Sequence, residues 1–478
     1  MTIFNILVFC LAALLLSPLF RKGWRLWILL IASLLSVYWL QPSVPIRNLD
    51  FWLPTLSIIL TIIVWIVTSK DPRAHLKQTI GAGIATAIIL LLIDLTRYFD
   101  PLCCLTPTRP PSTLTLLFFL AAAAGLSFLL ANASKARPLP VVAAISLLLV
   151  LIFLVLKTNP LGTAASTMFR SLTSQATNLA SSFDLRWLGF SYIAFRLLHN
   201  LRDRQGGKPH DLSLSEYITY VLFFPALTAG PIDRSQRFVQ DLRKPFRLTA
   251  GEITAGGWRI AWGMFKKFVL ADTLALIALN ETNAAQTNST IWVWVLVYAY
   301  ALRIYLDFSG YTDIAIGIGR WMGIRLPENF DRPYTRQNLT IFWNSWHMTL
   351  AQWFRAYFFN PVTRALRTSS RKLAMPLIIF IGQMGTMLLI GFWHGITLNF
   401  MLWGAWHGLG LFVHNRWSEA MRIRAGKNVQ SNPSPTRQRV SEIGGMLVTF
   451  HFVSLGWVWF ALPTPDLSWH VFLKLFGL

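Results

Sequence analysis

The clearest candidate for a catalytic residue in this chain is a histidine inside a glycine-flanked apolar motif. His394 stands in GFWHGITLNF (391–400), between an apolar run that ends there and another that follows. An imidazole titrates near neutral pH, so at a turn between buried helices it could accept a proton from a hydroxyl. The alternative is a structural histidine bonded to a backbone carbonyl, and these residues alone do not separate the two.

Two further histidines, His407 and His414, lie seven residues apart, which places them on one face of a helix. Zinc sites usually combine closer ligand pairs with cysteine or carboxylate ligands, and none are near. Cys10 stands alone, and the adjacent Cys103 and Cys104 rarely satisfy disulfide geometry with each other. We therefore expect neither a metal site nor a disulfide framework.

His347 belongs to a different kind of segment, FWNSWHMTLAQWFRAYFF (342–359). Tryptophans and Arg355 alternate there with apolar residues, a pattern typical of a segment that lies along the cytoplasmic interface of a membrane. The pattern predicts that His347 lies near the membrane surface rather than at its centre.

Asp307 and Asp313 end a long apolar run in DFSGYTDIAIGIGR. Six residues apart on a helix, they would face different directions, which argues against a paired-carboxylate mechanism. We expect them to pair with Arg303, Arg320 or backbone amides. Walker, Rossmann and nucleophile-elbow motifs are absent from the sequence.

Four other histidines are expected to carry no chemistry. His75 and His210 lie in basic loops, where a solvated side chain is expected, and His451 and His470 lie in or near the last apolar segments, where a hydrogen-bonded structural role is expected.

The elements that must position these residues are membrane helices. Of the 478 residues, 54% are apolar and only 13% are charged, about half the charged share of a soluble domain. Apolar runs of roughly 17 to 25 residues, long enough to cross a bilayer, recur along the chain, with weaker segments near 187–201, 214–230 and 337–366. The clear runs are 3–19, 24–40, 51–68, 79–95, 113–131, 139–156, 257–279, 291–306, 374–392, 397–414 and 444–462.

This pattern predicts an all-α, polytopic integral membrane protein with about eleven to thirteen helices that cross or enter the bilayer. The first run is expected to be the first span rather than a cleaved signal, because more spans follow it and no small-residue cleavage site does.

The formal net charge of +23 indicates topology rather than a nucleic-acid partner, because the basic residues lie in short loops between spans. Loops at 21–25, 70–77 and 135–137 are basic, whereas 41–50 and 96–112 are nearly balanced. The positive-inside rule then places the basic loops in the cytoplasm and the N-terminus outside the plasma membrane.

Two consecutive basic loops, 202–208 and 234–247, make a local prediction. The segment between them should enter the membrane and return on the same side. Pro225, Gly230 and Pro231 are compatible with such a broken path.

The composition changes near residue 186. Residues 1–185 consist mainly of plain apolar spans and are expected to be scaffold. In 186–478, charged residues, prolines and histidines occur inside or beside apolar stretches, which is typical of a functional core.

Seven motifs in one order resemble the membrane-bound O-acyltransferase family, in particular its bacterial branch of alginate O-acetyltransferases and teichoic-acid D-alanyl transferases. The resemblance covers about residues 187–462. The motifs are FFPALTAGPIDR (223–234), YLDFSGYTDIAIGIGR (305–320), LPENFDRPY (326–334), FWNSWHMTLAQWFR (342–355), GFWHG (391–395), NFMLWGAWHG (399–408) and LGWVWF (455–460).

The resemblance implies a helical core around a transmembrane tunnel. A thioester donor, acyl-CoA or an acyl carrier protein, would enter from the cytoplasm as cosubstrate, without a bound cofactor, and an acceptor hydroxyl would arrive from the other face. The family's near-invariant histidine falls on His394, which becomes the expected general base, and its second histidine falls on His347, which would position donor or acceptor.

Other predicted site residues surround this pair. Asn399 would orient the imidazole or polarise the thioester carbonyl, or would instead cap the following helix. Trp343, Trp346 and Trp393 would line the tunnel and exclude water. The remaining residues predicted to bind substrate are Asp307, Arg355 and His407.

Departures from the family pattern leave the substrate open. Asn344 and Ser345 replace residues that are basic in many relatives, and Ala356 replaces an aspartate. The expected reaction moves an acetyl or D-alanyl-like group to a hydroxyl of a cell-envelope polymer, with membrane lipids and an envelope-side transferase as further partners. The alternative is a transporter or flippase whose buried His and Asp residues relay protons or bind cargo. Related halves would be typical of a transporter, and the halves of this chain differ in composition.

Overall fold

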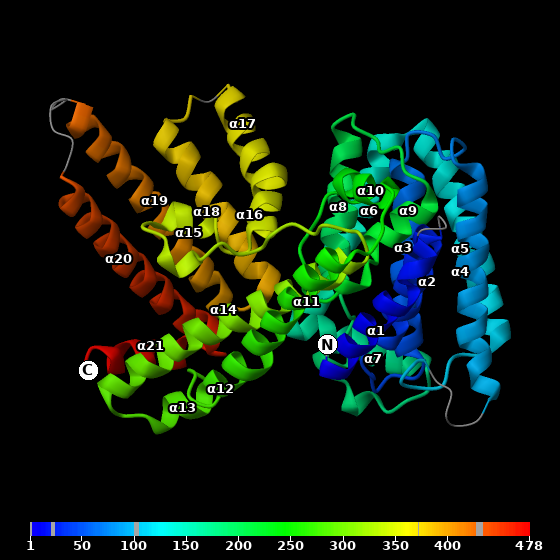
Figure 1. Ribbon diagram of the computed structural model, residues 1–478, viewed down its shortest axis with the longest axis horizontal. Helices are drawn as coiled ribbons and strands as arrows, with labels where there is room; N and C mark the ends of the chain where they lie inside the picture. The colour runs from blue at the N-terminus through cyan, green and yellow to red at the C-terminus, as the bar shows by residue number, and fades with distance from the viewer. Residues whose placement is uncertain (1, 21–23, 100–104, 371, 427–433) are drawn as a thin grey trace. The chain divides into compact units, whose positions relative to one another are not determined.

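The computed structural model describes residues 2–20, 24–99, 105–370, 372–426 and 434–478 (Figure 1). Arg21 and Lys22 of the first basic loop, and the pair Cys103 and Cys104, lie outside these residues. Within them the secondary structure is helical, with isolated bridges in place of strands. The predicted all-α class is confirmed.

Eight helices in the described ranges are long and apolar enough to cross a membrane, which confirms a multi-pass membrane protein. They are α1 (Ile3–Phe20), α3 (Leu49–Thr68), α4 (Leu76–Leu95) with the 3-10 turn after it, α5 (Thr113–Ala136), α6 (Pro138–Lys157), α14 (Thr290–Trp321), α18 (Met375–His394) and α20 (Pro435–Ala461).

Three of the predicted spans are not among these eight helices. The run at 24–40 becomes α2 (Arg25–Trp39), an apolar helix of 15 residues. The run at 257–279 is divided among α11 (Ala250–Met264), a π-helix, η5 (Phe265–Ala271), and α12 (Asp272–Ala275). The run at 397–414 opens α19 (Leu398–Gly426), which continues into a charged stretch. Of these three, α2 is short for a span, whereas 250–275 is one continuous helical stretch and α19 has 29 residues, so their crossing of the bilayer stays a prediction.

The segment predicted to be re-entrant is interrupted as expected. After α8 (Phe190–Gln205) comes α9 (Leu214–Val221), whose eight residues rise about 12 Å, too little to cross a hydrocarbon core. A 3-10 turn at Phe224–Ala226 and an irregular stretch then lead to α10 (Ser235–Arg243). The entry of this segment into the bilayer stays a prediction.

The chain forms two compact units. The first contains residues 1–260 and 314–327, and the second contains residues 261–313 and 328–478. In the first unit α3 is buried over most of its surface, and it packs against α2, α8 and α9. The second unit contains every predicted site residue.

The long helices of the second unit that build the site are α14, up to residue 313, and α18, α19 and α20, which pack in sequence against one another. The short ones are α13 (Glu281–Gln286), α15 (Leu339–Trp343), α16 (Met348–Phe354), a π-helix, η7 (Arg355–Phe359), α17 (Asn360–Thr368) and α21 (Pro465–Leu475).

Glycines let α18 and α19 approach backbone to backbone. A Cβ on Gly391 would collide with the carbonyl oxygen of Phe400, and one on Gly404 would lie 2.7 Å from the carbonyl oxygen of Met387. Gly408 follows Gly404 by four residues, the spacing at which small residues bring membrane helices together. This close contact fixes the position of the turn at the end of α18.

His210, expected to be solvated, is buried, and that prediction is wrong. The loop that carries it pairs with the end of α3: Lys70 N–H donates to His210 O at 2.8 Å. The imidazole stacks on Tyr217, with ring centroids 4.9 Å apart, and its Nε2 lies 2.9 Å from Thr68 Oγ1. Burial lowers the pKa of His210 to about 4. His75, by contrast, is partly exposed beside Asp211.

His451 and His470 have the structural role that was predicted. In each ring Nδ1 bonds, at 2.8 Å, the backbone carbonyl four residues earlier in its own helix, Leu447 O and Asp466 O respectively.

Candidate active site

His347 joins α15 to α16 in an unusual backbone conformation. Its φ of 42° and ψ of 53° lie in the left-handed region, which costs a residue with a Cβ on the order of 1 kcal/mol. The ring is buried against Phe308, edge to face, with centroids 4.7 Å apart. Such a conformation persists only where the surroundings hold it.

Asn329 holds the ring and determines its tautomer. Its Oδ1 accepts hydrogen bonds from the backbone N–H and the hydroxyl of Thr349, at 3.3 and 2.6 Å, which identifies this atom as oxygen. His347 Nδ1 lies 3.3 Å from the same oxygen and therefore carries the proton. Nε2 is buried and has no hydrogen-bond partner among the described residues. His347 thus presents an unoccupied lone pair.

His394 is the last residue of α18, half-buried and surrounded by aromatic rings. The centroids of Trp393 and Phe460 lie 4.5 and 4.6 Å from that of His394, and those of Trp403 and Phe400 lie 5.6 and 5.8 Å away. The predicted turn after this residue is present, because the helix ends here and α19 begins four residues later.

Trp393 brings the two histidines together. Its ring centroid is 4.5 Å from that of His394 and 5.8 Å from that of His347, so the imidazoles are at most about 10 Å apart. Two residues 47 positions apart in the chain are therefore parts of one aromatic cluster.

His407 lies deeper in this aromatic cluster. It is fully buried, and neither ring nitrogen has a hydrogen-bond partner among the described residues. Trp343 and Trp403 pack against it at 5.0 and 5.1 Å between centroids, and Trp403 also contacts His394. Trp346 is buried on another side of the cluster, against Trp457 at 5.1 Å.

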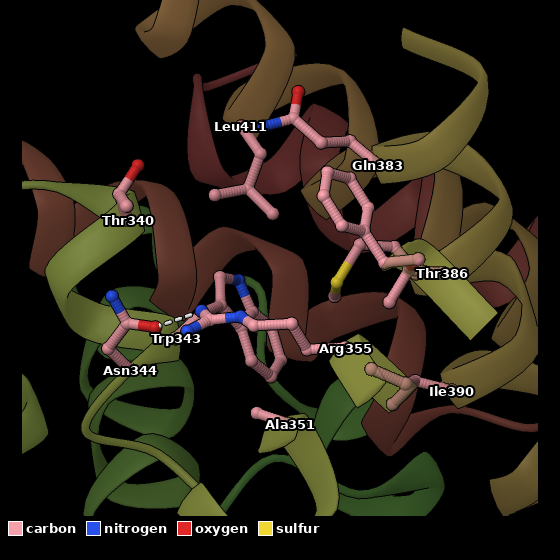
Figure 2. Close-up of a pocket in the computed structure, with 11 residues that line it drawn as sticks. Thr340, Trp343, Asn344, Ala351, Arg355, Gln383, Thr386, Ile390 and Leu411 are labelled. Carbon is pink, nitrogen blue, oxygen red and sulfur yellow. Dashed lines mark hydrogen bonds between the residues drawn. The ribbon is translucent and has the colours of Figure 1, made fainter. Parts of the chain in front are cut away.

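A pocket of about 160 Å³ adjoins Trp343 (Figure 2). Arg355, the first residue of η7, donates to Asn344 Oδ1 at its wall. Gln383 Oε1 and Trp343 Nε1 are buried without hydrogen-bond partners among the described residues. The lining residues therefore supply a cation, and in the wall a buried donor and a buried acceptor without partners among the described residues. Its wall is completed by Thr340, Ala351, Phe359, Thr386, Met387, Ile390 and Leu411.

The side-chain amide of Asn399 hydrogen-bonds residues between α20 and α21 and in α21. Its amide donates to Leu462 O at 2.7 Å and to Ser468 Oγ at 3.0 Å, so its hydrogens are committed to the connection between α20 and α21. The alternative role as a helix cap is wrong, because Thr397 accepts the Phe400 N–H and occupies that position.

Asp307 and Asp313 pair with lysines. Lys267 binds Asp307 and Lys266 binds Asp313, both from the π-helix η5 to α14. The expected partner Arg320 binds Glu252 instead. The arginine pairing predicted for Asp307 is therefore wrong, because the π-helix places consecutive lysines where α14 passes.

Three features of this site carried no role in the sequence analysis: Asn329, Trp403 and the lysines of η5. Asn329 stands between Glu328 and Phe330 in the motif LPENFDRPY, and membership of that motif was its only signal. No group of three or more His, Cys, Asp or Glu side chains suited to a metal occurs in the part of the chain that the structure describes.

A sequence model of the membrane-bound O-acyltransferase family matches residues 139–435, more than half of the chain. Among curated proteins, the probable alginate O-acetylase of Pseudomonas aeruginosa is 33% identical over 291 residues, which cover 61% of this chain and 51% of that protein. The peptidoglycan O-acetyltransferase of Helicobacter pylori is 33% identical, with 56% of this chain and 48% of that protein covered.

The teichoic acid D-alanyltransferase of Streptococcus thermophilus is 29% identical, with 59% of this chain and 70% of that protein covered. The chain thus spans about half the length of the first two relatives. These matches confirm the resemblance that the seven motifs indicated.

Proposed function

The chain belongs to the membrane-bound O-acyltransferase family, and we propose that it is an O-acyltransferase that moves an acetyl or D-alanyl-like group from a cytoplasmic thioester to a hydroxyl of a cell-envelope polymer. Relatives named for alginate, peptidoglycan and teichoic acid support a polymer acceptor. The observation that carries the proposal is that the rings of His394 and His347 both contact the ring of Trp393.

In the proposed reaction His394 is the general base. Its imidazole takes the proton of the acceptor hydroxyl as that oxygen attacks the thioester carbonyl. The new C–O bond forms, the C–S bond breaks, and the proton passes from His394 to the departing sulfur. His347, with Nδ1–H held by Asn329, accepts a hydrogen bond at Nε2 from the acceptor or the donor.

The aromatic cluster supplies the surroundings that this reaction needs. Trp343, Trp393 and Trp403 exclude water from the thioester, which limits hydrolysis. The pocket beside Trp343 supports donor binding, because Arg355 attracts an anionic donor and Gln383 Oε1 can accept an amide hydrogen. His407 is fully buried and packs edge to face against Trp343, which it supports.

The proposal also covers the membrane, the orientation and the partners of the protein. The protein lies in the plasma membrane with its N-terminus outside, takes its thioester from CoA or an acyl carrier protein in the cytoplasm, and works with an envelope-side transferase. Residues 1–185 serve as scaffold and 186–478 as the core that carries the chemistry. The basic loops contact lipid headgroups rather than nucleic acid.

The test is transfer of radiolabelled acetyl and D-alanyl groups, supplied as CoA and carrier thioesters, to polymeric material by reconstituted protein. His394→Ala should lower transfer about 10²- to 10⁴-fold. His470→Ala is the matched control, because that ring is exposed and bonds Asp466 O within its own helix. Equal transfer by wild type and a folded His394→Ala protein would contradict the mechanism and favour a transporter.

A further inference from the structure

A second pocket, of about 330 Å³, lies in the first unit, where the acyl-transfer residues are not found. The start of α2, the end of α10, the start of α11 and the end of α14 converge on it. Five cationic side chains line it against two carboxylates, so it holds three more positive than negative charges. The cations are Arg25, Lys244, Arg247, Arg320 and Arg325.

Arg25 is the fixed cation of this basic pocket. Only 5% of its surface is exposed. Its Nη2 donates to the carbonyl oxygens of Asp241 and Lys244, at 2.7 and 2.8 Å, where α10 ends. Its guanidinium lies over the ring of Phe246, 5.4 Å from the centroid. Nη1 is buried without a hydrogen-bond partner among the described residues. These contacts position the charge without neutralising it.

The two carboxylates compensate only part of the remaining charge. Asp241 lies 3.0 Å from the ammonium of Lys244, and Glu252 is shared by Arg320 and Arg325. Arg247 is exposed and forms no salt bridge with a described residue. Arg247 and Arg325 both line the pocket, and a guanidinium group can contact a phosphate through two donors at once.

An apolar groove of about 190 Å³ adjoins this pocket. It runs between α1 and α2 and is lined by side chains such as Phe20, Ile28 and Ala32. Phe20 contacts Phe246 of the basic pocket, with centroids 6.3 Å apart. The basic pocket therefore lies beside an apolar groove that is suited to a hydrocarbon chain.

We propose that the basic pocket binds the phosphate of an anionic membrane phospholipid, whose acyl chain occupies the groove between α1 and α2. A free phosphate would account for the cations but not for the groove. A lipid accounts for both, because headgroups lie where apolar helices end and acyl chains follow the helices inward.

The test measures the thermal unfolding midpoint of the purified full chain in neutral detergent, with added phosphatidylglycerol, phosphatidylcholine or inorganic phosphate. Phosphatidylglycerol should raise the midpoint more than phosphatidylcholine does. The double variant Arg247→Gln/Arg325→Gln should need about thirtyfold more phosphatidylglycerol for half of the rise. Both side chains are exposed, so the variant is expected to fold. Arg73→Gln removes an exposed arginine elsewhere in the unit and should behave as wild type.

Ala32→Phe separates the two sources of phosphate, because it fills the groove and leaves the cations in place. It should weaken the effect of phosphatidylglycerol. An unchanged lipid response in the double variant would overturn the proposal. So would a full rise with inorganic phosphate together with an unchanged lipid response in Ala32→Phe, which would indicate a free-phosphate site.

Discussion

At the scale of single residues, Asn329 determines the hydrogen-bonding state of His347. One oxygen atom receives hydrogen bonds from Thr349 and from His347 Nδ1, and in doing so it directs the lone pair of the second histidine. A ring held this way needs no reorganisation when substrate arrives, which is the usual benefit of a positioning residue.

Replacing Asn329 should therefore damage turnover more than donor binding. Asn329→Ala is expected to lower kcat about ten- to a hundredfold, the range seen for outer partners of metal-bound histidines, with little change in the donor KM. Asn329→Asp keeps the acceptor oxygen and should restore much of kcat with a shifted pH profile. Steady-state kinetics check this, with Asn360→Ala, an exposed asparagine of the same unit, as control. Equal loss in Ala and Asp variants would point to a merely structural role.

His210 predicts a specific dependence of stability on pH. Its pKa falls from about 6.5 in the unfolded chain to about 4 in the folded protein because burial disfavours the charged ring. The unfolded state thus binds the proton first, and stability decreases as pH falls from 6.5 towards 4. At pH 5 the loss amounts to about 2 kcal/mol. Nearby Asp211 and Glu216 oppose the shift without cancelling it.

Unfolding midpoints of wild type and His210→Gln between pH 7 and 5 would measure this effect. The wild type should lose stability more steeply than the variant, and the difference between the two curves isolates His210 from the other titrating groups. Parallel curves for wild type and His210→Gln would contradict the burial argument.

The sequence predicted the site residues that lie in local motifs. It did not predict residues whose role depends on contacts with distant parts of the chain. The motif around His394 predicted a turn between helices, and the turn is there. The burial of His210 depends on a backbone pairing with the end of α3, 142 positions earlier. The role of Asn329 depends on a hydrogen bond across a loop. Neither contact can be predicted from composition or periodicity.

At the scale of elements, the contact between α18 and α19 determines where the site forms. Gly391 and Gly404 bring the two backbones together, and the turn between them carries His394. Apolar runs predicted both helices, because run length and hydropathy are properties of single segments. The π-helices η5 and η7 could not be predicted, because a wider turn changes the hydrogen-bond register and leaves composition unchanged.

A single methyl group should be enough to disturb this contact. Gly404→Ala places a Cβ 2.7 Å from Met387 O and 3.0 Å from Leu388 Cα, so the helices must separate. We expect a loss of about 1–3 kcal/mol of stability and reduced acyl transfer, measured by denaturant unfolding and by the transfer assay. Gly444→Ala on α20 is the matched control, because its Cβ would meet nothing within 4 Å. That variant should be neutral or stabilised by up to about 1 kcal/mol.

At the scale of the whole molecule, the distribution of basic loops predicts which ends of the spans face the cytoplasm. Arg47 precedes α3 and Arg73 follows it, and both side chains are exposed. With the native cysteines replaced, Arg47→Cys should react with a membrane-impermeant maleimide in intact spheroplasts. Arg73→Cys should react only after permeabilisation. The opposite labelling pattern would invert the topology and with it the side from which the thioester enters.

Lys266 and Lys267 lie in a π-helix, and each binds a carboxylate of α14. Losing one residue from 265–271 would remove this wide turn and change the directions in which Lys266 and Lys267 point relative to α14. Charges left unpaired in such surroundings are costly. Descendants of this chain should therefore change the identity of residues in this stretch far more readily than their number, and insertions and deletions should accumulate elsewhere.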